Sequence, residues 1–124
     1  MIQLRSVLHV ADNTGAKFVY MIGRSKKGNK KLAYMGDIIN GVVKKADPYG
    51  QVKKGDKVYA VIVRTRKEKR RADGSYIRFD DNAVVILMDK DSTDPKGTRV
   101  FGPIAREVKD NGFNKIASLA KEIY

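Results

Sequence analysis

Four stretches of the chain combine apolar and β-branched residues in patterns typical of β-strands. Apolar side chains alternate along residues 16–23, and residues 37–46 are rich in β-branched residues, so each stretch predicts a strand. Along residues 57–65 and 83–88 the apolar side chains fall on both faces, which predicts strands that are buried on both sides. The pattern therefore predicts a mainly β fold.

Turn-forming residues separate these strands at short intervals, as in a meander. They tolerate a positive φ or preset a turn, and they lie at Asp12-Asn13-Thr14-Gly15, Lys27-Gly28-Asn29, Asp47-Pro48-Tyr49-Gly50, Lys54-Gly55-Asp56 and Asp73-Gly74. Gly41 lies inside a predicted strand, where a glycine often marks the sharp bend that a small closed barrel needs. We therefore favour a small β-barrel over a flat sheet.

The hydrophobic period changes after Gly102 and predicts a short two-helix portion at about residues 103–123. Pro103 suits the first turn of a helix, and Asn111-Gly112 is a natural stop. A second helix is expected to begin near Asn114 as N-cap. Its core-facing residues would be Ile116, Leu119, Ala120 and Ile123.

Length and composition limit the class of protein. A chain of 124 residues with 42% hydrophobic content predicts one folded domain, residues 1–124. With no cysteine and only His9, a disulfide framework, a cysteine nucleophile and most zinc chemistry are excluded, so we expect no metal and no cofactor. The longest apolar runs are far shorter than the roughly 20 residues of a membrane span, and no secretory signal is evident, so we expect a cytoplasmic protein without a membrane partner.

Positive charge is concentrated in one part of the chain. The 26 Lys and Arg exceed the 14 Asp and Glu by 12, and residues 24–71 alone carry a net charge of +12, which leaves the rest neutral. One charge run usually marks a solvated face, but four runs with little interspersed acid favour a nucleic acid. The candidate binding residues are Arg24, Lys26, Lys27, Lys30, Lys31, Lys44, Lys45, Lys53, Lys54, Arg64, Arg66, Lys67, Lys69, Arg70, Arg71 and Arg78.

The arginine-rich connector, residues 64–71, is the sharpest of these candidates. It follows a buried strand and leads into the Asp73-Gly74 turn, so we expect its ends to be pinned by the core and its middle to project into solvent. Arginine pairs bidentately with phosphate and stacks on exposed bases, which suits structured RNA. Tyr34, Tyr49 and Tyr76 could add stacking, although a single tyrosine is more often a rim residue.

Three motifs suggest enzymes but are better explained otherwise. Asp89 and Asp91 follow an apolar strand in a D-x-D-x-T pattern typical of phosphotransferases, but too little chain remains for the magnesium ligands and the doubly wound sheet. Residues 23–30 nearly match a phosphate-binding loop but lack its Lys and its hydroxyl. Asp80-Asp81 are adjacent, so they would point to opposite faces of a strand and are interpreted as a turn.

Six blocks of sequence are spread over the chain from end to end: residues 11–16, 36–39, 52–56, 60–65, 73–86 and 97–103. In the order and spacing of these blocks the whole chain resembles the universal large-ribosomal-subunit protein L-fourteen family, bacterial type. The departures lie in the lysine-rich residues 26–31 and in residues 89–94.

This resemblance implies a five-stranded β-barrel with a small helical C-terminal portion and no catalytic role. It further implies binding to large-subunit rRNA beside neighbouring ribosomal proteins, and contact with small-subunit rRNA at the subunit interface. A ribosome-silencing factor would dock around Thr98, Arg99 and Lys115. The alternatives are a non-ribosomal RNA-binding chaperone or, with less support, a phosphotransferase using Asp89 and Asp91.

Overall fold

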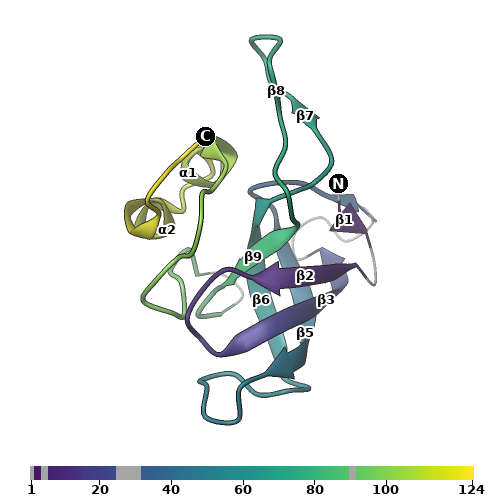
Figure 1. Ribbon diagram of the computed structural model, residues 1–124, viewed down its shortest axis with the longest axis vertical. Helices are drawn as coiled ribbons and strands as arrows, with labels where there is room; N and C mark the ends of the chain where they lie inside the picture. The colour runs from purple at the N-terminus through teal and green to yellow at the C-terminus, as the bar shows by residue number, and fades with distance from the viewer. Residues whose placement is uncertain (1, 4–5, 25–31, 90–91) are drawn as a thin grey trace.

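Five strands form a closed barrel at the centre of the molecule (Figure 1). The computed structural model describes residues 2–3, 6–24, 32–89 and 92–124. The barrel strands are β2 (Val7–Val10), β3 (Ala16–Arg24), β5 (Ile38–Ala46), β6 (Lys57–Arg64) and β9 (Ala83–Ile86), in that order around the barrel. Neighbours are antiparallel except β9 and β2, whose parallel pairing closes the ring.

The remaining elements are short and surround the barrel. β1 (Ile2–Gln3) pairs with β4 (Leu32–Ala33), and β7 (Lys69–Arg70) pairs with β8 (Tyr76–Ile77). The β7–β8 hairpin projects away from the barrel, while α1 (Arg106–Asp110) and α2 (Asn114–Leu119) lie against its side (Figure 1). None of the helices in the described part of the chain is long and apolar enough to cross a bilayer.

The structure confirms the predicted β-barrel. All four predicted strands are present, with ends that shift by one or two residues. At Gly41, however, the reason for glycine is a close approach between strands. A Cβ atom there would lie 2.3 Å from Val19 Cγ1 and 3.0 Å from the Tyr20 carbonyl oxygen.

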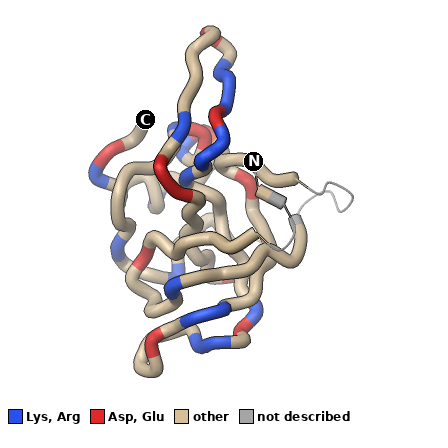
Figure 2. Tube along the Cα trace, turned by 45° about the vertical axis from the view of Figure 1, so that its right-hand side comes forward, with Lys and Arg blue, Asp and Glu red and all other residues tan. Residues whose placement is uncertain are grey.

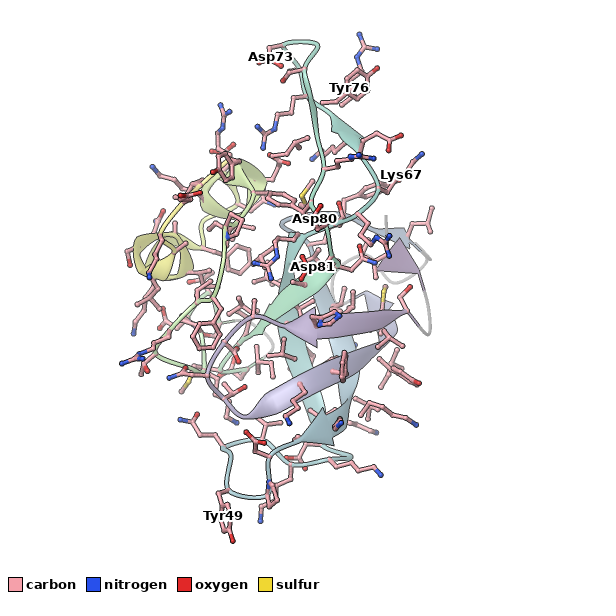
Figure 3. All side chains as sticks on the ribbon, viewed as in Figure 1. Tyr49, Lys67, Asp73, Tyr76, Asp80 and Asp81 are labelled. Carbon is pink, nitrogen blue, oxygen red and sulfur yellow. The ribbon has the colours of Figure 1, made fainter. Side chains whose placement is uncertain are left out.

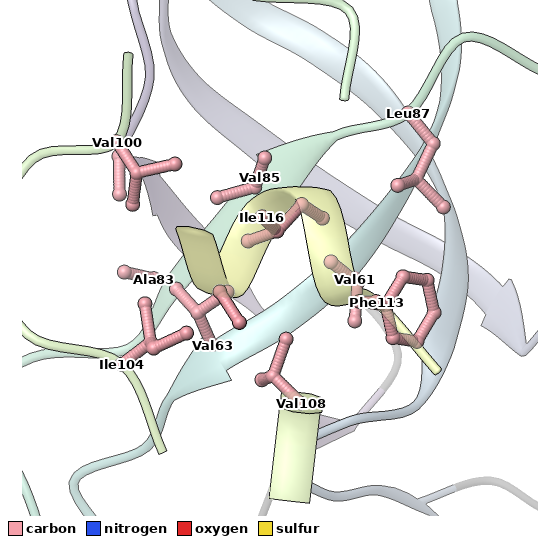
Figure 4. Packing of buried hydrophobic residues seen from close by; sticks show 12 residues of the cluster. Val61, Val63, Ala83, Val85, Leu87, Val100, Ile104, Val108, Phe113 and Ile116 are labelled. Atoms are coloured by element: carbon pink, nitrogen blue, oxygen red, sulfur yellow. The ribbon is translucent and has the colours of Figure 1, made fainter. Parts of the chain in front are cut away.

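Two layers of core explain why β6 and β9 are apolar on both faces. One face of each strand fills the barrel, where Ala60, Ile62 and Val84 are buried. The other face packs under the C-terminal portion (Figure 4). That second cluster includes Val61, Val63, Val85, Val108, Phe113 and Ile116.

The helical portion is confirmed, but both helices are shorter than the hydrophobic pattern predicted. α1 begins at Arg106 because the backbone before it pairs with other segments: the Ala105 N–H donates to the Val63 carbonyl, and the Tyr124 N–H donates to Ile104. Phe113, rather than Asn114, is the N-cap of α2. Ile123 lies beyond this helix, in a bridge with Ile104.

Candidate nucleic-acid interface

The arginine-rich connector, residues 64–71, forms the base and one side of the β7–β8 hairpin. The tip of the hairpin turns at Asp73-Gly74, where the Ser75 N–H and hydroxyl both donate to Asp73 Oδ1, at 2.9 and 2.6 Å. Gly74 has a φ of +88°, which favours glycine. These local bonds make a tight tip that carries Asp73 and Tyr76 far from the barrel (Figure 3).

Arg66, Arg70 and Arg78, which we term the hairpin arginines, are exposed. None of them lies within 4.0 Å of a carboxylate among the residues that the structure describes. Lys67 differs because its ammonium contacts Glu68 at 3.0 Å, and that hydrogen bond is the main reason why the pKa of Glu68 is lowered. The hairpin arginines are therefore exposed cations outside the ion pairs of the described residues, although the charge of Arg78 also helps to lower the pKa of Glu68. Figure 2 shows in blue where Lys and Arg lie along the chain.

Arg64 differs from the hairpin arginines, because its guanidinium is bonded inside the protein. The residue is only 9% exposed. Nε and Nη2 donate to the two oxygens of Asp81 at 2.9 and 3.2 Å, and Nη1 donates to the carbonyls of Phe101 and Pro103. Arg64 therefore joins the barrel to the C-terminal portion, and its binding to RNA stays a prediction.

Arg71 is also engaged internally. Its Nε and Nη2 donate to Glu107 Oε1 at 3.1 and 2.8 Å, and both side chains are largely buried. Lys69 Nζ lies 3.8 Å from the other oxygen of Glu107. This cluster ties the hairpin to α1, so the connector lies as expected, with both ends held by the protein and its middle exposed.

A second cationic group, the barrel-end lysines, lies at the opposite end of the molecule and consists of Lys44, Lys45, Lys53 and Lys54. The Gly55 N–H donates to the Val43 carbonyl, and the Val43 N–H donates to the Asp56 carbonyl, so the turn carrying Lys53 and Lys54 folds against β5. Asp56 Oδ2 is occupied by the Lys53 N–H at 2.9 Å. All four lysines are exposed, and none is ion-paired with a described residue.

The sequence interpretation missed a pocket of about 500 Å³ beside these lysines on the outer face of the barrel. Its lining includes Val7, Phe18, Tyr20, Lys44, Lys45 and Lys54, and we term it the apolar–lysine pocket. The alternation along residues 16–23 could have placed Phe18 and Tyr20 on one face. It could not show which distant lysines the barrel brings beside them.

The three predicted stacking tyrosines are exposed, and two of them lie at opposite ends of the molecule. Tyr49, at 99% exposure, lies at the barrel end, and Tyr76 lies on the projecting hairpin (Figure 3). Tyr34 is also exposed. Their stacking on bases stays a prediction.

The predicted protein-docking residues lie on two segments, the loop that contains Thr98 and Arg99 and the helix α2 that contains Lys115. The Asn13 side chain holds the loop: its Oδ1 accepts from the N–H groups of Thr98 and Arg99, and its Nδ2 donates to Thr98 Oγ1. Lys115 lies in the first turn of α2. All three side chains are exposed. Each segment is anchored by the next residue along the chain, Val100 after Arg99 and Ile116 after Lys115, and both of these belong to the same core cluster.

Several candidates lie outside the described residues: Lys26, Lys27, Lys30, Lys31 and Asp91. The side chain of Arg24 is likewise not described. The structure therefore tests neither the lysine-rich turn nor the full D-x-D-x-T motif.

The described carboxylates do not assemble a site for phosphoryl transfer. Asp81 is committed to Arg64, while the adjacent Asp80 is exposed. Within residues 2–3, 6–24, 32–89 and 92–124, no three His, Cys, Asp or Glu side chains are grouped to hold a metal. His9 packs edge-on against Phe18, with ring centroids 4.9 Å apart.

Comparison with known protein families accounts for the whole chain at once. The model of the family described as ribosomal protein L14p/L23e matches residues 1–124, so the match includes barrel, hairpin and C-terminal portion. That family consists of structural ribosomal proteins of the large subunit, located on cytoplasmic ribosomes, and not of enzymes. The chain therefore belongs to the ribosomal protein L14p/L23e family.

Proposed function

We propose that the protein binds large-subunit rRNA through the hairpin arginines and the barrel-end lysines. The observation that carries this proposal is the separation of two kinds of cation: Arg64 and Arg71 have carboxylate partners, whereas these two groups have none among the described residues. Unneutralised positive charge is costly to a free protein because the charges repel each other. A polyanion removes that cost.

The mechanism is one of rigid presentation. The closed barrel fixes the turn that carries the barrel-end lysines, and the bonds of Arg64 and Arg71 fix the base of the hairpin. The cations then displace counterions from rRNA phosphates and hold folded RNA segments in one arrangement. No group of the protein needs to change its covalent state.

We further propose that Thr98, Arg99 and Lys115 form a protein-docking surface near the subunit interface. The double hydrogen bonding of Asn13 to Thr98 supports this proposal, because it leaves an exposed loop rigid. A ribosome-silencing factor is the expected occupant, and small-subunit rRNA is the expected neighbour. Replacing Arg99 with Ala should weaken retention of the purified factor on large subunits.

The salt dependence of binding tests the main proposal. If roughly six phosphates are contacted, the logarithm of the association constant for deproteinised large-subunit rRNA should fall against the logarithm of salt with a slope of about −4 to −5. A slope near zero would contradict rRNA binding by phosphate contacts. Sedimentation of large subunits through a high-salt sucrose gradient separates a ribosomal component, which stays bound, from a loosely associated chaperone.

A further inference from the structure

The apolar–lysine pocket lies across three neighbouring strands of the barrel. Val7 of β2 pairs directly with Tyr20 of β3, and Phe18 of β3 pairs with Lys45 of β5. Residues on one face of paired strands lie side by side. The strands therefore make a continuous floor from residues that are far apart in the chain.

This floor is apolar although it faces solvent. The inward neighbours Leu8 and Val19 already fill the barrel, and the C-terminal portion packs on β6 and β9 instead (Figure 1). Val7 is consequently 47% exposed, and Phe18 and Tyr20 are half-buried. Exposed apolar surface that is grouped in one place marks an interaction site.

Three lysines, Lys44, Lys45 and Lys54, border the floor. Lys44 Nζ lies over the Tyr20 ring, 4.9 Å from its centre, in a cation–π contact. A base that stacks on this side of the ring would displace the ammonium toward its flanking phosphate. The turn held to Val43 brings Lys54 to the same rim. No Asp or Glu is among the described residues that line this pocket.

A second, larger pocket shows why this charge pattern is informative. That pocket, of about 660 Å³ at the base of the hairpin, is lined by Asp80 and Asp81 as well as by Arg64 and Arg78, so positive and negative side chains balance there. An apolar floor bordered by lysines alone instead matches the two parts of a nucleotide, an aromatic base and an anionic backbone.

We infer that the apolar–lysine pocket holds an unstacked nucleobase of rRNA against Phe18 and Tyr20, with the flanking phosphates on Lys44, Lys45 and Lys54. This inference rests on the proposed function and adds the kind of RNA element that is bound: a bulged or single-stranded nucleotide rather than a paired stem. Aromatic side chains on the strands of small barrels accept stacked bases in this way.

The experiment separates stacking from charge in the full chain bound to deproteinised large-subunit rRNA. Phe18→Leu and Tyr20→Leu keep apolar bulk but remove the ring, so each should weaken binding about tenfold (about 1.4 kcal/mol) without changing the salt slope. Lys44→Gln and Lys54→Gln should each make the slope shallower by about 0.7 to 0.9. Tyr124→Leu, which removes an exposed ring in the C-terminal segment outside the pocket, is the matched control and should leave the affinity within twofold.

A second measurement guards against variants that fail to fold. Large subunits carrying the wild-type protein are irradiated with ultraviolet light, after which the RNA is digested with nuclease and the protein with trypsin. A nucleotide adduct is expected on the peptide of residues 18–24, which contains both rings of the floor. Absence of this adduct, or protection of the peptide by another protein, would overturn the inference.

The two proposals fail in different ways. If wild-type binding is tight and steeply salt-dependent but both leucine variants bind equally well, the stacking inference is wrong while rRNA binding stands. If the wild type shows weak binding without salt dependence, both are wrong.

Discussion

The ends of the arginine-rich connector, residues 64–71, do a different job from its middle. Arg64 and Arg71 point into the protein and meet Asp81 and Glu107, whereas Arg66 and Arg70 point out and meet no described carboxylate. The same run of basic residues thus includes arginines that hold the hairpin in place and arginines that the hairpin exposes to solvent. A count of positive residues does not show how many are free to bind a partner.

This comparison also explains why the hairpin can project so far. A two-stranded hairpin alone is marginally stable in water. Here Arg64 fixes its base to the loop of Phe101 and Pro103, and Arg71 fixes it to α1. The inward arginines therefore hold the outward ones in position.

Replacing Arg64 with Ala is expected to have the largest effect on stability. The change leaves Asp81 and two carbonyl groups without their donor, so the free energy of unfolding should fall by about 3 kcal/mol. Urea unfolding at neutral pH measures the loss. Arg66→Ala is the matched control and should stay within about 0.5 kcal/mol of the wild type; similar losses in both variants would refute the division between inward and outward arginines.

Replacing Arg71 with Gln should have a smaller effect of the same kind. The Arg71–Glu107 pair is largely buried but at the edge of the fold, so we expect a loss of about 1.5 kcal/mol in the free energy of unfolding. The control is its neighbour, Arg70→Gln, which removes the same charge from an exposed position. Equal stability of the two variants would show that the link to α1 is dispensable.

Asp12 should give the smallest effect, visible as a pH dependence. Burial raises the pKa of its carboxyl above the ordinary value of 3.8, although the carboxylate accepts bonds from Thr14 and from the Ile86 N–H. The folded state therefore holds this proton more tightly than the unfolded state, so the contribution of Asp12 to stability is greatest below pH 3.8 and declines as the pH rises through the raised pKa.

Unfolding of the wild type and of Asp12→Asn, followed from about pH 3 to about pH 7, measures this contribution. The stability of the wild type relative to Asp12→Asn should fall as the pH rises. A rise in the relative stability of the wild type with pH would contradict the conclusion that burial raises the pKa of Asp12.

Local pattern was sufficient for much of the fold, because strands, turns and short helices depend on residues that are close in sequence. The apolar faces of residues 57–65 and 83–88 and the Asp73-Gly74 turn were predicted on that basis and are present. The ends of the helices were not, because Ile104 pairs with the C-terminal segment instead of entering α1.

The fates of individual cations could not be predicted in this way. Arg64 finds Asp81 17 residues later, and Arg71 finds Glu107 36 residues later. Barrel closure likewise brings Val7, Phe18 and Lys54 to one pocket. These contacts depend on tertiary structure, so the positions of the basic residues in the sequence do not predict them.

The most direct test compares the salt dependence of rRNA binding for Arg70→Gln and Arg71→Gln, which remove one charge each from adjacent residues. We predict that Arg70→Gln makes the slope shallower by about 0.7 to 0.9, because an outward cation no longer displaces a counterion. Arg71→Gln should leave the slope unchanged. Equal changes in both variants, or a change in Arg71→Gln alone, would contradict the assignment of rRNA binding to the outward cations.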